Sequence, residues 1–263
     1  SGPEEFMGGS IVIWTTTPWT IPANRAIAYS KSIDYGLYEV TSAPEDNWAK
    51  TGEKLVLADA LAESVMAAAR VDGYERRADV DPSIVELCAH PFRGLDGADG
   101  YWDFDVPTLA ADYVTDDAGT GFVHTAPGHG ADDYNSFVNN REIFAAVGMT
   151  EVPHTVGEEG QYFDHVPLLA GKRVFDRKGK EGDANKAVIE LLTQTGALIA
   201  RGRVTHSYPH SWRSKAPLIF RNTAQWFISM DSHGLRKTAL KAIDDTRFVP
   251  ESGRTRIRGM IET

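Results

Sequence analysis

Residues 11–24 read IVIWTTTPWTIPAN, and this stretch carries the main expectation about the fold. Ile11–Thr17 is a run of β-branched and aromatic residues that ends at Pro18, which is typical of a buried strand leading into a constrained loop. The threonines at residues 15–17 then lie at a strand end, where each hydroxyl can donate and accept hydrogen bonds. Threonine is also an ordinary strand residue, so this stretch alone assigns it no function.

The rest of the chain alternates short strands with a few helices. Further strands are predicted at residues 25–29, 35–40, 54–57, 198–206 and 218–221, and several more with turns between residues 78 and 123. Helices are predicted from Asp59 to just before Gly73, from near Ala131, from Asp183 to Gly196, and over Leu235–Ile243. This pattern favours an α+β domain around a closed or partly closed sheet over regular βαβ alternation.

The composition is that of an ordinary globular protein. The chain has 263 residues, of which 42% are hydrophobic and 24% charged, so we expect one domain over residues 11–263. The net charge is −10, but it is uneven: residues 199–263 hold 12 Lys and Arg against 5 Asp and Glu, a net charge of +7. That part of the chain is the better candidate to face a phosphate backbone, although a basic surface is often only solvated.

The N-terminal sequence and the cysteine content bound the cellular context. Residues 1–10, SGPEEFMGGS, match no strand or helix pattern and are predicted to be vector-derived. No signal peptide or long apolar segment is visible, so a cytoplasmic location is expected. Cys88 is the single cysteine, which rules out an internal disulfide and a multi-cysteine zinc site.

Three polar or glycine-rich segments adjoin apolar strands: residues 14–24, 119–133 and 207–226. The second reads GTGFVHTAPGHGADD and follows neither the phosphate-binding P-loop nor the dinucleotide fingerprint. His124 follows an apolar strand and Asp133 lies at a predicted helix start, so the two are expected to converge on one pocket. A carboxylate there suits a protonated amino group, although a lone histidine is also a common structural hydrogen-bonder.

A metal site is a competing interpretation of the same segment. His124, His129, Asp132 and Asp133 resemble a crude ligand cluster, which would make the domain a metallohydrolase. The H-x4-H spacing across a Pro-Gly turn is not a known zinc pattern. No G-x-S-x-G nucleophile motif is present either, so covalent catalysis has no evident residue.

The three segments together resemble a known family. WTTTPWTIPAN, GTGFVHTAPGHGADDY and YPHSWRSKAPLIFRNTAQWFI are similar, in this order, to the editing insertion of isoleucyl-tRNA synthetases, and the similarity runs from about Ile11 to Thr263. The related valyl and leucyl enzymes have an arginine after the threonines, whereas Thr17 and Pro18 follow here. Ser211 stands where many relatives have cysteine. The H-I-G-H and K-M-S-K-S signatures are absent, as expected of an excised insertion without the aminoacylation site.

The resemblance implies a β-barrel-like core with peripheral helices and an aminoacyl-tRNA deacylase, which hydrolyses valine from mischarged isoleucine tRNA without metal or cofactor. One methylene gives too little discrimination between isoleucine and valine in a single binding step, so a second pocket removes the smaller amino acid. Asp133 is implied to anchor the substrate ammonium. The residues implied to position the ester, the terminal adenosine and the attacking water are Thr15, Thr16, Thr17 and Asn24.

The resemblance also assigns the walls of the pocket. Trp19 and His124 are implied to line it, with His124 on the side that excludes isoleucine. Residues with a weaker assignment to the tRNA end are Tyr208, Arg213, Lys215 and Arg221. A metal-dependent hydrolase and a noncatalytic tRNA-binding module remain as alternatives.

Overall fold

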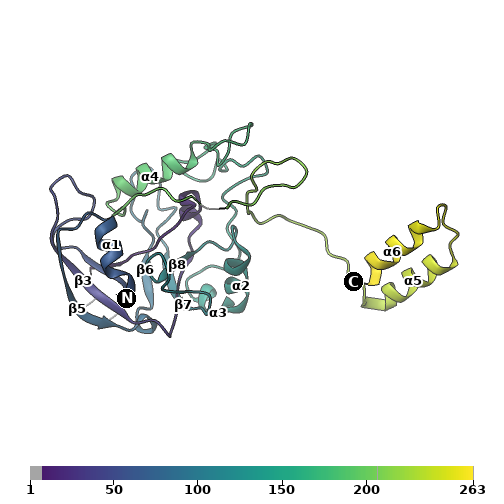
Figure 1. The fold of residues 1–263 in the computed structure, drawn as a ribbon, viewed down its shortest axis with the longest axis horizontal. Helices are drawn as coiled ribbons and strands as arrows, with labels where there is room; N and C mark the ends of the chain where they lie inside the picture. Colours follow the sequence, from purple (N-terminus) through teal and green to yellow (C-terminus); the bar gives the residue numbers. More distant parts are fainter. Residues whose placement is uncertain (1–7, 206, 263) are drawn as a thin grey trace. The chain divides into compact units, whose positions relative to one another are not determined.

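Two four-stranded sheets form the framework of the first of two units, which extends to Asn222 in this computed structural model (Figure 1). The structure describes residues 8–205 and 207–262. The first sheet has the order β1-β4-β3-β5, with β1 Gly9–Ile11, β3 Tyr35–Ser42, β4 Lys54–Ala58 and β5 Gly73–Val80. The second has the order β6-β7-β2-β8, with β2 Ala26–Tyr29, β6 Leu87–Ala89, β7 Asp105–Ala110 and β8 Phe122–Thr125. One pair in each sheet is parallel, β1 with β4 and β2 with β7.

The α+β class with peripheral helices is confirmed, whereas the described residues form no closed barrel. Within them the two sheets stay separate, and each keeps two edge strands: β1 and β5 in the first sheet, β6 and β8 in the second. Both sheets instead bury side chains in one shared core, to which Leu37 and Val56 contribute from the first sheet and Ile27 and Phe122 from the second.

Backbone contacts join the two sheets at the turn that precedes β8. The N–H of Ala58 donates to the carbonyl of Thr120 at 2.9 Å, and the hydroxyl of Tyr35 donates to the carbonyl of Gly121 at 2.8 Å. Gly121 has φ of +80°, and a Cβ there would lie 2.4 Å from the Cβ of Ala58. Only glycine permits this approach, which fixes the start of β8 and hence the position of His124.

Helices cover the second sheet and a second core. The helices of this unit are α1 Ala62–Ala68, α2 Ala131–Asn139, α3 Arg141–Ala146 and α4 Ala184–Gln194, and its 3-10 helices are η2 Pro18–Ala23, η3 Asp59–Leu61 and η4 Pro82–Ile84. Phe137 of α2 and Phe144 of α3 pack with Ala26 of β2. Val188 of α4 packs in the second core, around Trp19. The predicted helices near residues 59, 131 and 183 are thereby confirmed.

Three strand predictions fail. The strand predicted over Ile11–Thr17 ends at Ile11 and begins at Gly9, so residues 9 and 10, assigned above to a vector, pair with β4. Residues 15–17 lie in a loop that leads into η2. No strand forms at residues 198–205 or 218–221, and His206 lies outside the described residues. An isolated bridge between His210 and Pro217 is the ladder contact near the second of these segments.

The second unit, from Thr223 onward, is described by itself. It contains η5 Ser232–Gly234, α5 Leu235–Asp245 and α6 Ser252–Glu262, so the predicted final helix is confirmed and α6 was not predicted. Arg258 of α6 pairs with Asp244 of α5 at 2.5 Å. The chain thus divides into two compact units at Asn222, and the single domain expected over residues 11–263 stays a prediction. Each helix described, in either unit, is too short or too polar to cross a membrane.

Candidate functional site

A buried chain of hydrogen bonds runs through His124 in β8. Nε2 of His124 lies 2.9 Å from Oγ1 of Thr20, and Nδ1 lies 3.3 Å from Nδ2 of Asn24. Nδ2 of Asn24 also donates to the carbonyl of Ala26 at 3.0 Å. Because an amide nitrogen only donates, Nδ1 accepts, and Nε2 therefore carries the hydrogen that is donated to Thr20. Thr20 then donates its own hydrogen to the carbonyl of Thr17 at 2.9 Å, so the chain joins the threonine loop, residues 15–17, to β8.

The protonation state of His124 follows from its burial. The residue is 8% exposed, and burial, assisted by the nearby His129, lowers the pKa of His124 to about 4. The ring is therefore neutral at pH 7. At neutral pH one nitrogen of the ring accepts a hydrogen bond and the other donates one. His124 thereby connects Asn24 to Thr20, and the ring is held in one orientation.

The threonine loop presents paired hydroxyls beside this chain. Oγ1 of Thr15 lies 3.3 Å from Oγ1 of Thr17 and accepts the backbone N–H of Thr17 at 3.0 Å. Both side chains are half-buried, whereas Thr16 is exposed. A hydroxyl offers one donor and two acceptor sites. The loop is thus held in place while hydrogen-bonding capacity remains for a ligand.

Asp133 lies in the first turn of α2, as predicted. Its Oδ2 accepts the backbone N–H of Ala126 at 2.7 Å, which holds the carboxylate at the end of β8, two residues beyond His124. Burial raises the pKa of Asp133 from 3.8 to about 6, and the charge of Asp132 adds to this effect. A half-buried carboxylate of this kind is the strongest negative charge at the site, and it is mostly ionised above pH 7.

Trp19 is a core residue more than a pocket wall. It is 4% exposed and belongs to the second core. Its backbone N–H donates to Oδ1 of Asn185 at 3.1 Å, and its carbonyl accepts the hydroxyl of Tyr162. The indole edge meets the ring of His129, with the centroids 4.9 Å apart. Trp19 thereby supports η2, from which Thr20 and the threonine loop are held.

His129 is fully engaged in structural contacts. Its Nδ1 donates to the carbonyl of Phe220 at 3.0 Å, and its Nε2, at 2.9 Å, accepts from the hydroxyl of the buried Thr155. Burial lowers the pKa of His129 to about 4. Both nitrogens of His124 and of His129 are therefore occupied, and over the described ranges, 8–205 and 207–262, no group of three His, Cys, Asp or Glu side chains lies close enough to hold a metal ion.

The residues assigned to the tRNA end belong to other contacts. The hydroxyl of Tyr208 donates to the carbonyl of Leu218 at 2.7 Å, and its ring packs on Phe175 at 5.8 Å. Arg213 lies over the ring of Trp212 at 5.0 Å. Lys215 is exposed, and Arg221 faces Glu158 at 3.8 Å. The partners in these contacts are residues outside the hydrogen-bonded chain at His124. A role of Tyr208, Arg213, Lys215 and Arg221 at the tRNA end stays a prediction.

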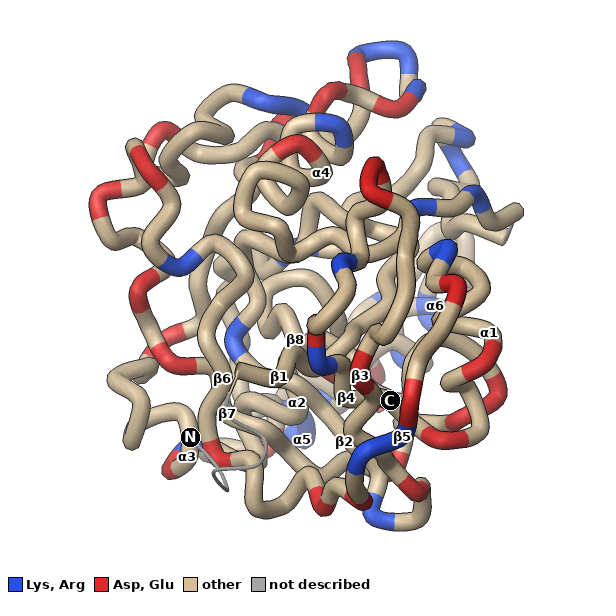
Figure 2. Tube along the Cα trace, turned by 90° about the vertical axis from the view of Figure 1, so that its left-hand side faces the viewer, with Lys and Arg blue, Asp and Glu red and all other residues tan. Residues whose placement is uncertain are grey.

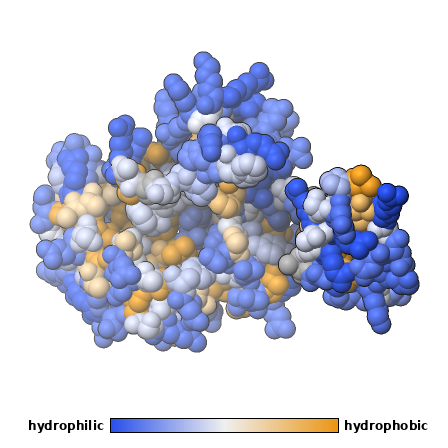
Figure 3. All heavy atoms as spheres, turned by 45° about the vertical axis from the view of Figure 1, so that its right-hand side comes forward, coloured by the Kyte–Doolittle hydropathy of each residue, from blue (hydrophilic) through white to orange (hydrophobic). Residues whose placement is uncertain are grey.

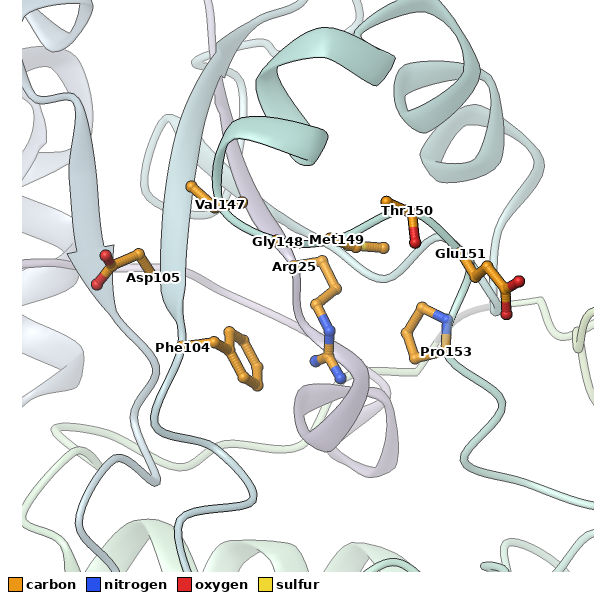
Figure 4. A pocket seen from close by; sticks show the side chains of 9 residues that line it. All are labelled: Arg25, Phe104, Asp105, Val147, Gly148, Met149, Thr150, Glu151 and Pro153. Atoms are coloured by element: carbon orange, nitrogen blue, oxygen red, sulfur yellow. The ribbon is translucent and has the colours of Figure 1, made fainter.

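Arg25 is a positioning residue that the sequence analysis missed. Its guanidinium donates to the carbonyls of Asn24 at 2.6 Å and Pro22 at 3.4 Å, and it lies 4.1 Å from the centroid of the Phe104 ring. Burial lowers the pKa of Arg25 to about 10. Figure 4 shows it pointing between Phe104 and Pro153 in a pocket of about 330 Å³. The signal that indicates this role is a cation directly after the last turn of η2, where backbone carbonyls point along the helix axis.

The surroundings of the site are mixed in charge. Charged residues lie mainly along peripheral loops and helix surfaces, around a mostly uncharged centre (Figure 2). On the face shown in Figure 3, hydrophobic atoms form small patches within a largely hydrophilic surface. Asp133 adds its negative charge close to that of Asp132, which favours a small cationic group of a ligand over an anionic one.

Comparisons with known proteins point to one family. A family model described as tRNA synthetases class I (I, L, M and V) matches residues 23–263. Proteins called "Isoleucine--tRNA ligase" from Rhodopseudomonas palustris and Bradyrhizobium diazoefficiens are 53% and 54% identical to the chain, over 99% and 96% of its length. The chain spans only 27% and 26% of these relatives. A solved structure titled "The crystal structure of GlLeuRS-CP1" has a TM-score of 0.48 and 17% identity, and the match covers 73% of this chain and 84% of that one.

Proposed function

Since the chain belongs to the class I tRNA synthetases, we propose that it is the editing domain of an isoleucyl-tRNA synthetase. The proposed reaction is hydrolysis of the ester that joins valine to the terminal ribose of isoleucine tRNA. The identity to isoleucine tRNA ligases along nearly the whole chain supports this assignment. The observation that carries it is a set of hydrogen bonds that brings these residues together. Thr20 bonds to both the carbonyl of Thr17 and His124, and Asp133 accepts the N–H of Ala126, two residues beyond His124.

Recognition of the amino acid rests on charge and size. The carboxylate of Asp133 binds the α-ammonium of valine, because a charge-assisted hydrogen bond in a partly desolvated site is stronger than a neutral one. The neutral ring of His124 forms the wall that limits the size of the amino-acid side chain in the pocket. Valine fits there, and the additional methylene of isoleucine does not.

Hydrolysis then depends on positioning. The hydroxyls of Thr15, Thr16 and Thr17 orient the ester and a water molecule, and Asn24 holds the loop against β8. Water attacks the carbonyl carbon, the carbon–oxygen bond to the ribose breaks, and a proton passes to the ribose oxygen. Aminoacyl esters are already activated, so orientation and hydrogen bonding to the developing oxyanion suffice without a covalent intermediate.

Deacylation of two substrates in parallel tests the proposal. The chain is expected to release valine from valyl-tRNA and to leave isoleucyl-tRNA intact, and the valyl activity is expected to survive EDTA. Release of labelled amino acid over time is the measurement. Activity lost in EDTA and restored by Zn²⁺ would identify a metal-dependent hydrolase. Binding of tRNA without release of valine would identify a noncatalytic module.

The pH dependence tests the charge at Asp133. The pKa of Asp133 is raised to about 6, and its ionised form is the one that binds an ammonium. The ratio of enzymatic to spontaneous valyl-tRNA hydrolysis is therefore expected to fall as pH decreases from 7 to 5. Asp133→Asn, which does not titrate, should lose this inflection. An unchanged inflection in that variant would assign the titration to another group.

A further inference from the structure

A second pocket lies beside the start of α2, on the segment that also carries Asp133. Its volume is about 230 Å³, and it lies between the backbone of Gly128 and Gly130, the ring of Tyr134 on α2, and the side chains of Phe220 and Arg221. The pocket is formed by two chain segments that lie about 90 residues apart in sequence. The same two segments are joined by the hydrogen bond between His129 and Phe220, which are 91 residues apart.

The backbone on both sides of this pocket is held in place. The N–H of Asn222 donates to the carbonyl of Gly128 at 2.7 Å, and Nδ1 of His129 donates to the carbonyl of Phe220 at 3.0 Å. Both bonds use main-chain atoms of the later segment. The side chain of Phe220 makes neither of these two bonds. It can therefore be replaced without breaking them.

The side chains of this pocket suit a flat aromatic ligand. Tyr134 is 41% exposed and Phe220 is 51% exposed, although each is an aromatic ring that burial would stabilise. Aromatic rings and an arginine around one opening are the groups on which unstacked nucleobases stack in proteins that bind single-stranded RNA. Pockets for drug-sized ligands start at roughly 300 Å³, so this smaller pocket suits a small flat group such as a single base.

We propose that this pocket holds an unpaired nucleobase of the tRNA 3′ end, from the nucleotide next to the one that carries the ester. The inference rests on the proposed editing function. It is supported by proximity, because a Cβ at Gly130 would lie 3.2 Å from Cγ of Asp133. His129 further links the two places, since its ring contacts Trp19 and its Nδ1 holds Phe220.

Tyr134→Ala and Phe220→Ala test the pocket with two substrates. One is valyl-tRNA, and the other is the valine ester of adenosine, which has no second base. Loss of a stacking contact corresponds to about a five- to 150-fold effect per base. The expected result is a fall in kcat/KM for valyl-tRNA at least five-fold larger than the fall for the adenosine ester. Tyr134→Phe and Phe220→Tyr keep an aromatic ring and should restore most of the valyl-tRNA activity.

Tyr74→Ala is the matched control, because Tyr74, on β5 of the first sheet, is a tyrosine of similar exposure, 36% against 41% for Tyr134. It should leave both rates unchanged. Equal losses on both substrates would mean that the pocket residues only support the catalytic site, and no loss on valyl-tRNA would mean that no base binds there. Either result overturns the inference. A wild-type chain that cleaves neither substrate would contradict the proposed function itself, and the inference would fall with it.

Discussion

Asp133→Ala is expected to lower kcat/KM for valyl-tRNA deacylation by roughly ten- to several-hundred-fold, the range for loss of a charge-assisted partner. The reason is that the carboxylate, held at the end of β8 by the N–H of Ala126 at 2.7 Å, is the proposed anchor of the substrate ammonium. Initial rates at several concentrations of valyl-tRNA measure the effect.

Asp132→Ala is the control for this prediction. Asp132 is exposed in the same turn of α2, so its removal changes the net charge and the helix start in the same way. It should lower the rate much less. A folded Asp133→Ala variant with undiminished activity would remove Asp133 from substrate binding.

The folding stability of Asp133→Asn separates loss of function from loss of structure. Because the folded-state pKa of Asp133 is raised from 3.8 to about 6, the folded chain binds this proton more tightly than the unfolded chain. The protonated carboxyl therefore adds to the free energy of unfolding. This contribution is fully present below pH 3.8 and is lost as pH rises through 6, which lowers the free energy of unfolding by at most about 3 kcal/mol. Asparagine keeps an acceptor for Ala126 without a charge, so the variant should be less active at pH 7.5 and yet unfold at a higher urea concentration.

Local signals in the sequence identified most helices and several strands. Asp183 and Gly196 flank α4, and Gly196 adopts φ of +71°, the conformation that ends a helix. Val188 and Leu191 are buried on its inner face. Such features depend on neighbours within a few residues, so a single sequence contains them.

The strands that failed depend on partners far away in sequence. Residues 198–205 and 218–221 contain β-branched or apolar residues, but the structure gives them no adjacent strand. Pro209 and Pro217 also lack the N–H that a longer ladder around the His210 bridge would need. In the same way, the apolar run at Ile11–Thr17 leaves the sheet after Ile11, although β4 continues to Ala58. The N–H of Ala58 donates to the carbonyl of Thr120, which lies more than 100 residues away from the run.

The sequence named residues of the candidate site but few of the contacts between them. That His124 and Asp133 converge on one pocket stays a prediction; the structure shows that Asp133 accepts the N–H of Ala126, two residues beyond His124. It did not indicate that Thr20 and Asn24 occupy both nitrogens of His124, because these partners lie 104 and 100 residues away. These two bonds fix the orientation of the ring that the resemblance places on the side that excludes isoleucine, and this steric role stays a prediction.

His124→Ala is expected to make the chain hydrolyse correctly charged isoleucyl-tRNA while it retains part of its valyl-tRNA activity. Truncation removes the ring that is proposed to occupy the space of the extra methylene, so the repulsive part of the discrimination disappears. The ring is neutral at pH 7, since its pKa is lowered to about 4, and both of its nitrogens are hydrogen-bonded, so the expected effect of truncation is on the size of the pocket. Release of isoleucine and of valine must be followed in parallel reactions.

Thr20→Val is the control that distinguishes two causes of specificity: the volume of the His124 ring and the hydrogen bonds that the ring makes. It removes the partner of Nε2, 2.9 Å away, and leaves the volume of the His124 ring in place. Isoleucyl-tRNA should be cleaved by His124→Ala and spared by Thr20→Val. If both variants gain this activity, the chain of hydrogen bonds sets the specificity by positioning the threonine loop. If a folded His124→Ala leaves isoleucyl-tRNA intact and loses valyl-tRNA deacylation, His124 binds the substrate or acts in catalysis, and the steric role is wrong.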